Sequence, residues 1–359
     1  MILRTIWERY FFKELLKAFF LFLGCFFFMY ALFDYSAHMQ YFIVNKRVEP
    51  ALLAIYYSNY FIKYSYLLIP LALMIATIKV LSTLNLRGEL VALQASGLRL
   101  RLLLRPFFFL AALCTLFNYL STELLFPNSL SYLEQFRKTH FHRKLDKKKK
   151  GVHVLYLKDQ SKLVYQNFDS GKNAFFDVYW IRSLNDMWRI KHLSSDPKNP
   201  TGQFVDHLER NKEGGLEKTA SYDSYRFDEL KWNRSMTEKG LIPIENRKIS
   251  ELFKICFSKK THSSYARSQA LSNFLFKCAM PFIPFLVVIA AAPYCVRYSR
   301  NIRLFFTYAI ALFGFVAIYA LLDAAVILGE NLVASPWIVV LGPLALCSLF
   351  FSWKFATVR

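Results

Sequence analysis

The sequence lacks the short motifs that identify many nucleotide hydrolases and membrane-bound enzymes. It has no Gly-x-x-x-x-Gly-Lys-Ser/Thr phosphate loop, so we expect that the chain does not hydrolyse ATP itself. The His-x-x-x-x-Asp pattern of membrane acyltransferases and the His-Glu-x-x-His pattern of zinc proteases are also absent. No serine–histidine–aspartate set and no pair of carboxylates can be argued from the spacing. We therefore predict that the chain is not an enzyme and has no catalytic residue and no cofactor of its own.

Cysteine is scarce outside apolar segments. Of the six cysteines only Cys256 lies in a hydrophilic stretch, so that stretch cannot hold an internal disulfide. The others lie in apolar runs, where a thiol usually serves as a small packing residue. There is no Cys-x-x-Cys and no zinc spacing. His140 and His142 could form a metal-binding pair, but solvated surface histidines are the favoured interpretation. We therefore predict no metal site.

A cleavable signal peptide is not indicated either. Arg4, Arg9, Lys13 and Lys17 precede the first apolar run, as they would in a signal peptide. The run is long, however, and no Ala-x-Ala site follows it. We predict that it is retained as the first membrane helix.

Long apolar runs are what the sequence does have. The composition is 55% hydrophobic, yet the formal net charge is +21, and these two facts are compatible because apolar and basic residues are segregated. Most of the runs reach or approach the roughly 20 residues of a membrane helix. They occupy residues 18–33, 64–78, 106–122, 278–296, 304–322 and 331–353. A soluble enzyme is thereby excluded, and so is a nucleic-acid-binding role for the basic charge.

The basic residues of the short connections predict the orientation of these helices. They form four groups: the N-terminal tail, residues 87–105, residues 297–303 and the C-terminus. Lys and Arg favour the cytoplasmic side in short loops, whereas long loops cross the membrane largely regardless of charge. Six helices with both termini in the cytoplasm place all four groups inside. The long segment 128–268 then lies outside the cytoplasm.

The long segment has the pattern of strands. Alternating apolar residues occupy 152–157, 162–168, 174–183 and 187–193, and turn signals separate them. More strands and a partly helical return to the membrane are expected over 202–267. The run Asp146–Lys150 is best interpreted as a solvated loop. We predict a polytopic α-helical membrane protein with three helices over 1–127, an inserted all-β domain over 128–268, and three helices over 269–359.

A short helix is predicted between the second and third membrane helices. Residues 89–96 favour a helix and Gly97 is a natural stop after it. On the cytoplasmic side such a helix can lie on the bilayer, or it can dock into a groove on a cytoplasmic partner with Glu89 as a charged contact.

The segment Glu89-Leu-Val-Ala-Leu-Gln-Ala-Ser-Gly97 closely resembles the coupling-helix motif of the LptF/LptG family of lipopolysaccharide-export permeases. The chain length, the arrangement of helices around a β domain and the motif's place near 86–99 match as well. Met280-Pro281 and Pro336-Trp337 are also similar to the family. Arg87-x-Glu89 with Gln94-Ala-Ser-Gly97 favours the LptG type. Where the family often has basic residues, this chain has Asp34 and His38, and Tyr294 replaces a glycine.

The resemblance implies an ABC-exporter permease of the bacterial inner membrane, active in outer-membrane biogenesis. Its inserted domain over 128–268 would be a periplasmic, β-jellyroll-like domain. It would pair with a paralogous permease subunit, bind a cytoplasmic ATPase dimer that holds the ATP, and pass lipopolysaccharide to a periplasmic bridge protein. The expected ATPase-binding residues are Arg87, Glu89, Leu90, Val91 and Leu93.

Lys63, Arg267 and Lys277 are the expected contacts to the lipid, because cations at the outer ends of helices need an anionic neighbour. Snorkelling to ordinary phospholipid is an equal alternative.

Two other functions remain open on the sequence. A mechanotransmitting ABC membrane subunit would use the same ATPase but move no lipid. A secondary transporter would need ionisable residues at mid-membrane, and only Asp323 approaches this; pairing of Asp323 with a neighbouring helix is the simpler expectation.

Overall fold

The structure, a computed structural model, consists of two compact units. A helical unit comprises Met1–Phe141, Lys248–Lys254 and Ser268–Arg359, and a sheet unit comprises His142–Arg247 and Ile255–Arg267. The residues that the structure describes are 5–40, 42, 49–140, 153–157, 161–169, 174–183, 185–194, 196, 200–210, 215–227, 229–230, 246–257, 264–296 and 304–357.

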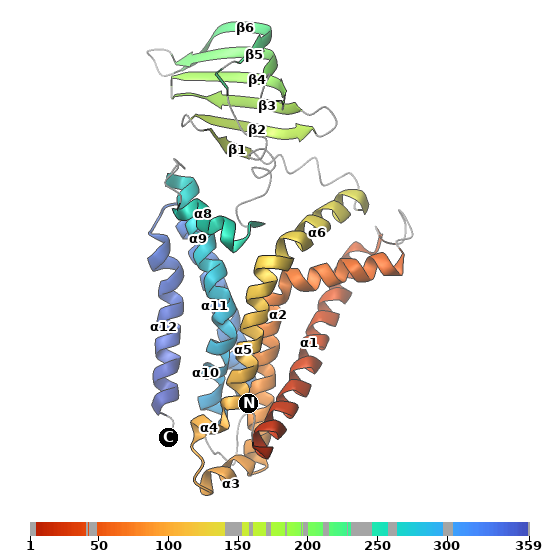
Figure 1. Cartoon of the computed structure of the whole chain (residues 1–359), viewed down its shortest axis with the longest axis vertical. Coiled ribbons are helices and arrows are strands. Elements are labelled where there is room, and N and C mark those ends of the chain that lie inside the picture. The colour runs from red at the N-terminus through yellow and green to blue at the C-terminus, as the bar shows by residue number, and fades with distance from the viewer. Residues whose placement is uncertain are drawn as a thin grey trace. The chain divides into compact units, whose positions relative to one another are not determined.

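The helical unit contains six helical stretches that are long and apolar enough to cross a membrane (Figure 1). The prediction of six such helices is therefore confirmed by length and composition. The elements are α1 (Ile6–Gln40), α2 (Pro50–Leu86), α3 (Glu89–Ala95), α4 (Leu100–Leu103), α5 (Arg105–Leu120), a π-helical turn η2 (Ser121–Leu125), α6 (Phe126–His140), α9 (Ser264–Ala279), a 3₁₀ turn η4 (Met280–Phe282), α10 (Ile283–Val296), α11 (Leu304–Glu330) and α12 (Pro336–Thr357).

The third membrane stretch is longer than its apolar run. The chain continues from α5 through η2 into α6, so the predicted division at residue 128 falls inside a helix. Residues 128–140 are largely polar, and therefore no apolar run marks this extension. A further amphipathic helix, α8 (Ile249–Phe257), precedes the return into α9.

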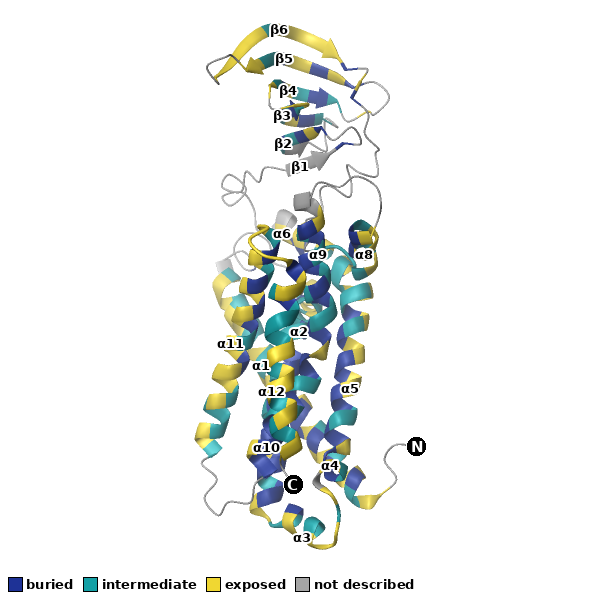
Figure 2. Cartoon of the chain, turned by 90° about the vertical axis from the view of Figure 1, so that its left-hand side faces the viewer, coloured by how far each residue is buried: buried dark blue, intermediate teal, exposed yellow. Residues whose placement is uncertain are grey.

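α2 is the central helix of the unit. In its most apolar window 72% of the residues are buried, against 22% in α11 and 6% in α12. Figure 2 shows a similar contrast for α10, which carries many buried residues, whereas α11 and α12 carry many exposed ones. Long apolar side chains on the outer helices are expected to face lipid, which is as apolar as they are.

Buried polar groups tie the helices together. The Asn85 amide of α2 donates to the Cys295 carbonyl oxygen of α10 at 2.9 Å, and the Tyr319 hydroxyl of α11 donates to the Tyr66 carbonyl oxygen at 2.8 Å. Such bonds hold membrane helices together because no hydrophobic force acts between helices in lipid. α3 lies at the end of the unit where α1 begins and α12 ends, called the α3 end below (Figure 1).

The sheet unit contains one antiparallel sheet of six described strands. The strands pair in chain order: β1 (His153–Tyr156), β2 (Lys162–Asp169), β3 (Ala174–Ile181), β4 (Asp186–Ser194), β5 (Thr201–Arg210) and β6 (Leu216–Arg226). The first four match the predicted strands within a few residues, and β5 and β6 fall where further strands were expected. The inserted all-β domain is thus confirmed, and its described strands run as a meander.

The sheet is creased along one line that crosses its strands. On β3 the buried residues Phe175 and Val178 are three residues apart, whereas simple alternation would place them two apart. Their partners on β4, Leu193 and Ile190, show the same step. Because both strands carry one extra residue at this line, the pairing stays in register on either side of it.

The crease bends the strands because the extra residues leave the regular extended conformation. Asp177 on β3 and Phe204 on β5 have φ angles of 50° and 51°, in the left-handed region that residues other than glycine seldom adopt. Extra residues of this kind bend a strand and increase its twist. The sheet is accordingly curved, as Figure 1 shows.

The inner face of the curved sheet carries the core of the unit. Trp180, Phe175 and Val205 are buried there, and burial raises the pKa of the Tyr165 phenol to about 12. Phe227, which follows β6, folds back across this face. The residues of the cluster are Leu157, Leu163, Tyr165, Phe175, Val178, Trp180, Ile190, Leu193, Val205, Phe227 and Leu230.

Candidate functional site

The connection from α2 through α3 to α5 is built around two glycines. Gly88 has a φ of 74° and Gly97 a φ of 86°, and both angles are strained for any other residue. Gly88 lets the chain turn from the end of α2 directly into α3, and Gly97 follows the end of α3. The predicted short helix with its glycine stop is therefore confirmed.

One side of α3 belongs to the core of the helical unit. Leu90 is only 2% exposed, and Leu93 packs in part against the same core. The sequence interpretation had both residues filling a groove on a partner, but this packing inside the chain leaves only Val91 of the three apolar residues exposed. The buried side holds this short helix against α2, and the nearby Asn85–Cys295 bond joins α2 to α10.

The other side of α3 is exposed and has small side chains. It consists of Val91, Ala92, Ala95 and Ser96. Arg87 and Glu89 stand beside it, with 3.7 Å between Arg87 Nη1 and Glu89 Oε1. The Arg87 side chain is 61% exposed, and an ion pair of this kind contributes little by itself. Both charges are accessible to a partner.

The three predicted lipid contacts lie in different surroundings. The Lys63 ammonium is 5.2 Å from the centre of the Tyr64 ring, and Lys277, only 9% exposed, lies 5.2 Å from the centre of the Phe126 ring. Arg267, at the start of the fourth membrane stretch, is exposed.

A tyrosine cluster beside Lys63 escaped the sequence analysis. Its tyrosines come from α1, α2 and α6, and the Arg137 guanidinium donates to the Tyr60 hydroxyl. Lys63 also faces the Tyr60 ring, so two cations share one aromatic ring. The spacing of four between tyrosines 56, 60 and 64 is the signal that could have revealed it. The tyrosines are Tyr30, Tyr35, Tyr56, Tyr57, Tyr60, Tyr64 and Tyr132.

Asp34 and His38, four residues apart on α1, form a polar pair. His38 Nδ1 lies 3.4 Å from Asp34 Oδ1 and 2.9 Å from the Asp34 carbonyl oxygen. The Tyr56 hydroxyl donates to Asp34 Oδ2 at 3.4 Å, which joins the pair to the tyrosine cluster. Asp323 is exposed on α11, and no hydrogen bond or ion pair joins it to another described residue, so its pairing with a neighbouring helix stays a prediction.

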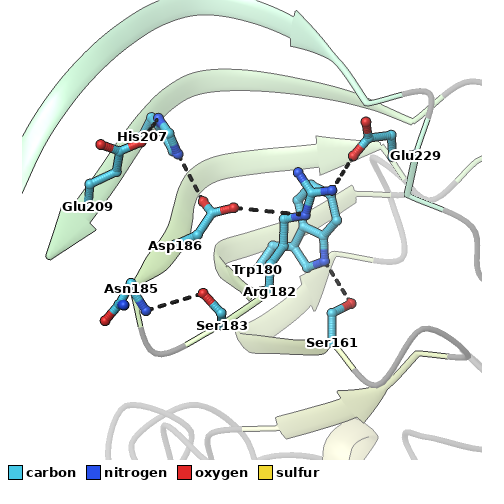
Figure 3. A network of polar contacts seen from close by, with 9 residues as sticks. All are labelled: Ser161, Trp180, Arg182, Ser183, Asn185, Asp186, His207, Glu209 and Glu229. Carbon is cyan, nitrogen blue, oxygen red and sulfur yellow. Dashed lines mark hydrogen bonds and ion pairs between the residues drawn. The ribbon is translucent and has the colours of Figure 1, made fainter.

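A polar network on the sheet connects neighbouring strands (Figure 3). His207 Nε2 lies 2.9 Å from Asp186 Oδ1, and its ring stacks on Trp188 with 4.1 Å between centroids. Arg182 bonds Glu229 at 2.5 Å and lies 3.9 Å from Asp186. The His207 imidazole is held between the Asp186 carboxylate and the Trp188 ring. It points at no nucleophile among the residues drawn in Figure 3, and we therefore assign the network to stabilising the sheet.

The comparisons with known proteins agree with this architecture. The chain matches the family described as lipopolysaccharide export system permease LptF/LptG over residues 9–357. The comparison with curated proteins finds no match. The family description covers both paralogues, so the lean towards the LptG type stays a prediction. With six apolar helices and an inserted sheet, and a match over nearly its whole length, the chain belongs to the LptF/LptG family of lipopolysaccharide-export permeases of the bacterial inner membrane.

Proposed function

We propose that the chain transmits the motion of a cytoplasmic ATPase dimer to the membrane helices that extract lipopolysaccharide. The observation that carries this proposal is α3, a short helix with one side packed against the helical core beside α2, which is bonded to α10, and with the other side exposed. Withdrawing acyl chains from a bilayer requires about 0.8 kcal/mol per CH₂ group, so extraction needs an external source of work. Among the described elements, α3 is the best placed to receive it.

The proposal requires that the α3 end faces the cytoplasm and the sheet unit the periplasm. The four basic groups of the short connections support this orientation. In a background without the native cysteines, Ala95→Cys on α3 and Thr219→Cys on β6 are both exposed positions. An impermeant thiol reagent applied to spheroplasts should label position 219 and spare position 95. The reverse pattern would overturn the topology and the transport proposal with it.

Glu89 is the first residue to test in ATPase coupling. Burial of its carboxylate against a partner arginine would desolvate the pair, and losing one member of such a pair costs about 2–5 kcal/mol. Glu89→Ala should therefore weaken co-purification of the ATPase or uncouple hydrolysis from lipid release in proteoliposomes. Glu134→Ala, which removes an exposed carboxylate from α6, is the matched control. Wild-type values for Glu89→Ala in both assays would leave α3 as a membrane-surface helix.

The paralogous subunit is proposed to pack against α11. Asp323 is an exposed carboxylate within a membrane stretch, a position that normally marks a polar partner. Asp323→Leu should reduce co-purification of the paralogue, whereas Leu321→Ala, at an exposed apolar position nearby, should not. Equal recovery of the paralogue with both variants would refute this contact.

Lipopolysaccharide is proposed to pass over the inner face of the sheet to a periplasmic bridge protein. The inner face is apolar and suits acyl chains, and an edge strand such as β6 offers backbone groups to a bridge strand. A photoreactive phenylalanine analogue at Phe175, which points inward, should crosslink lipopolysaccharide. The same analogue at Phe176, which is 39% exposed, should not.

A mechanotransmitting subunit that moves no lipid is the second candidate. Phe227 and Leu230 of the chain itself cover part of the inner face, and this favours a sheet that carries force rather than cargo. If the analogue at Phe175 gave no crosslink to lipopolysaccharide while ATPase coupling stayed intact, the mechanotransmitting function would be favoured.

Lys63, Lys277 and Arg267 are proposed to hold lipid phosphates before extraction, together with Arg137. Lys63→Gln with Lys277→Gln should reduce lipid crosslinking to the helical unit. Lys79→Gln, an exposed lysine further along α2 towards α3, is the control. If the double variant behaves as the control, snorkelling to ordinary phospholipid is the better account.

A further inference from the structure

A hollow lies among α2, α10, α11 and α12, in the half of the helical unit near the α3 end. Its volume is about 450 Å³ and its lining is largely apolar. The lining on α11 extends from Phe306 to Ile318, a rise of about 18 Å along the helix. Half of a bilayer's hydrocarbon core is about 15 Å thick, so the hollow has the length of an acyl chain in one leaflet.

Small residues keep this space open. Gly314 lines the hollow, and a Cβ atom added there would meet no atom within 4 Å. Ala290, Ala291 and Ala311 are neighbours in the lining. The hollow is therefore a consequence of side-chain size on α10 and α11.

A cation stands at the mouth of the hollow. Tyr294, near the end of α10, is part of the lining, and Lys354 of α12 donates to its hydroxyl at 2.6 Å, with the ammonium 3.9 Å from the centre of the ring. No carboxylate of the described residues pairs with Lys354. The ammonium has two further N–H donors, and the exposed Trp353 beside it is typical of the membrane–water interface.

We propose that this hollow binds one acyl chain of an anionic bilayer phospholipid, with the lipid phosphate held by Lys354 and Tyr294. Basic pockets between membrane helices on the cytoplasmic side are suited to anionic headgroups. The neighbouring cavity of about 620 Å³, lined by residues of α5, α9, α10 and α12, has no matching pair, because its lining tyrosine, Tyr119, donates to the Cys278 carbonyl oxygen. The same argument therefore does not extend to it. Under the proposed orientation the site faces the cytoplasmic leaflet, away from the exported lipid, but the site itself does not depend on that orientation.

Native mass spectrometry of the full chain released from nanodiscs tests the proposal. The nanodiscs contain phosphatidylglycerol and phosphatidylcholine in equal amounts. The wild-type chain should retain one phosphatidylglycerol. Gly314→Leu should lose it, because the new side chain fills the hollow. Lys354→Gln should lower the preference for phosphatidylglycerol about fivefold, the factor expected for one cation at a membrane surface.

Gly24→Leu is the matched control, since a Cβ atom at Gly24 on α1 also meets nothing within 4 Å and lies outside the hollow. It should retain the lipid as the wild type does. If Gly314→Leu does not fold, a photoreactive acyl chain that labels residues 306–318 of the wild type supplies the second measurement. Equal retention by all variants, no preference for the anionic lipid, or displacement of the phospholipid by added lipid A would each overturn the proposal.

Discussion

Removing the Asn85 side chain tests how much one buried hydrogen bond adds to the packing of α2 against α10. The Cys295 carbonyl lies in the last turn of α10, where carbonyl groups have no partner within the helix, and Asn85 supplies that partner at 2.9 Å. Asn85 is 2% exposed, so water cannot replace its amide. Asn85→Ala should therefore leave a buried carbonyl unsatisfied.

The magnitude follows from that geometry. Hydrogen bonds between membrane helices average about 0.6 kcal/mol, whereas an unsatisfied buried group costs about 1–3 kcal/mol. We expect Asn85→Ala to lower the free energy of unfolding by about 1–3 kcal/mol. Asn85→Leu should lose a similar amount, because it keeps the volume and removes the donor.

Unfolding of the full chain in mixed detergent micelles, followed by tryptophan fluorescence, measures this loss. Asn59→Ala is the control, since the Asn59 amide bonds only the Ile55 carbonyl of its own helix at an exposed position. The coupling between ATP hydrolysis and lipid release should also fall in the Asn85 variants alone. Unfolding energies for both Asn85 variants within about 0.5 kcal/mol of the Asn59 variant would refute the reasoning.

Three further predictions concern close packing and charge. Gly329→Ala should destabilise the helical unit by about 1–3 kcal/mol, because its Cβ would lie 2.5 Å from Ser272 Oγ. In a double-mutant cycle, Ser272→Ala should relieve part of this loss. Additive losses of the two variants would contradict the contact. Gly202→Ala should destabilise the sheet by a similar amount, since its Cβ would lie within 3.0 Å of three side chains. Unfolding followed by fluorescence measures this loss. An unchanged free energy of unfolding would mean that the inner face is loosely packed. Hydrogen bonds from Lys218 and Ser221 hold the pKa of Asp206 below its ordinary value, so the stability that this carboxylate contributes is present above about pH 4 and is lost as the pH falls through the lowered pKa. Lys218→Gln should raise the Asp206 pKa in a ¹³C NMR titration, and an unchanged midpoint would show that the bond does not form in solution.

Much of the fold was predictable because the strongest patterns in the chain are physical necessities. An uncharged run of about 20 residues must be helical in lipid, where each backbone group needs a partner. The first four strands were predictable from alternation, since one face of the sheet is buried. The α6 extension was not predictable in this way, because its residues are polar and the helix is stabilised by packing of Leu133 and Phe136 against the tyrosine cluster.

The candidate site was predictable in its position but not in its surfaces. The glycines at 88 and 97 bracket the short helix, and their positive φ angles explain why glycine is needed there. Which side of α3 is buried depends on α2 and the other helices packed around it, and the spacing within seven residues does not reveal this. Leu90 and Leu93 were therefore assigned to a partner although they pack within the chain. The crease escaped prediction for a related reason, because a step of three between buried residues resembles a break in a strand.

The crease also limits how the sheet can change during evolution. A deletion at the crease in β3 alone would move every residue beyond it to the opposite face, exchanging buried and exposed side chains against the unchanged β4. The neighbouring strands would have to lose their extra residues together for the pairing to survive. Single-residue insertions and deletions should therefore accumulate in the turns between strands, while the bend itself is inherited as one indivisible feature.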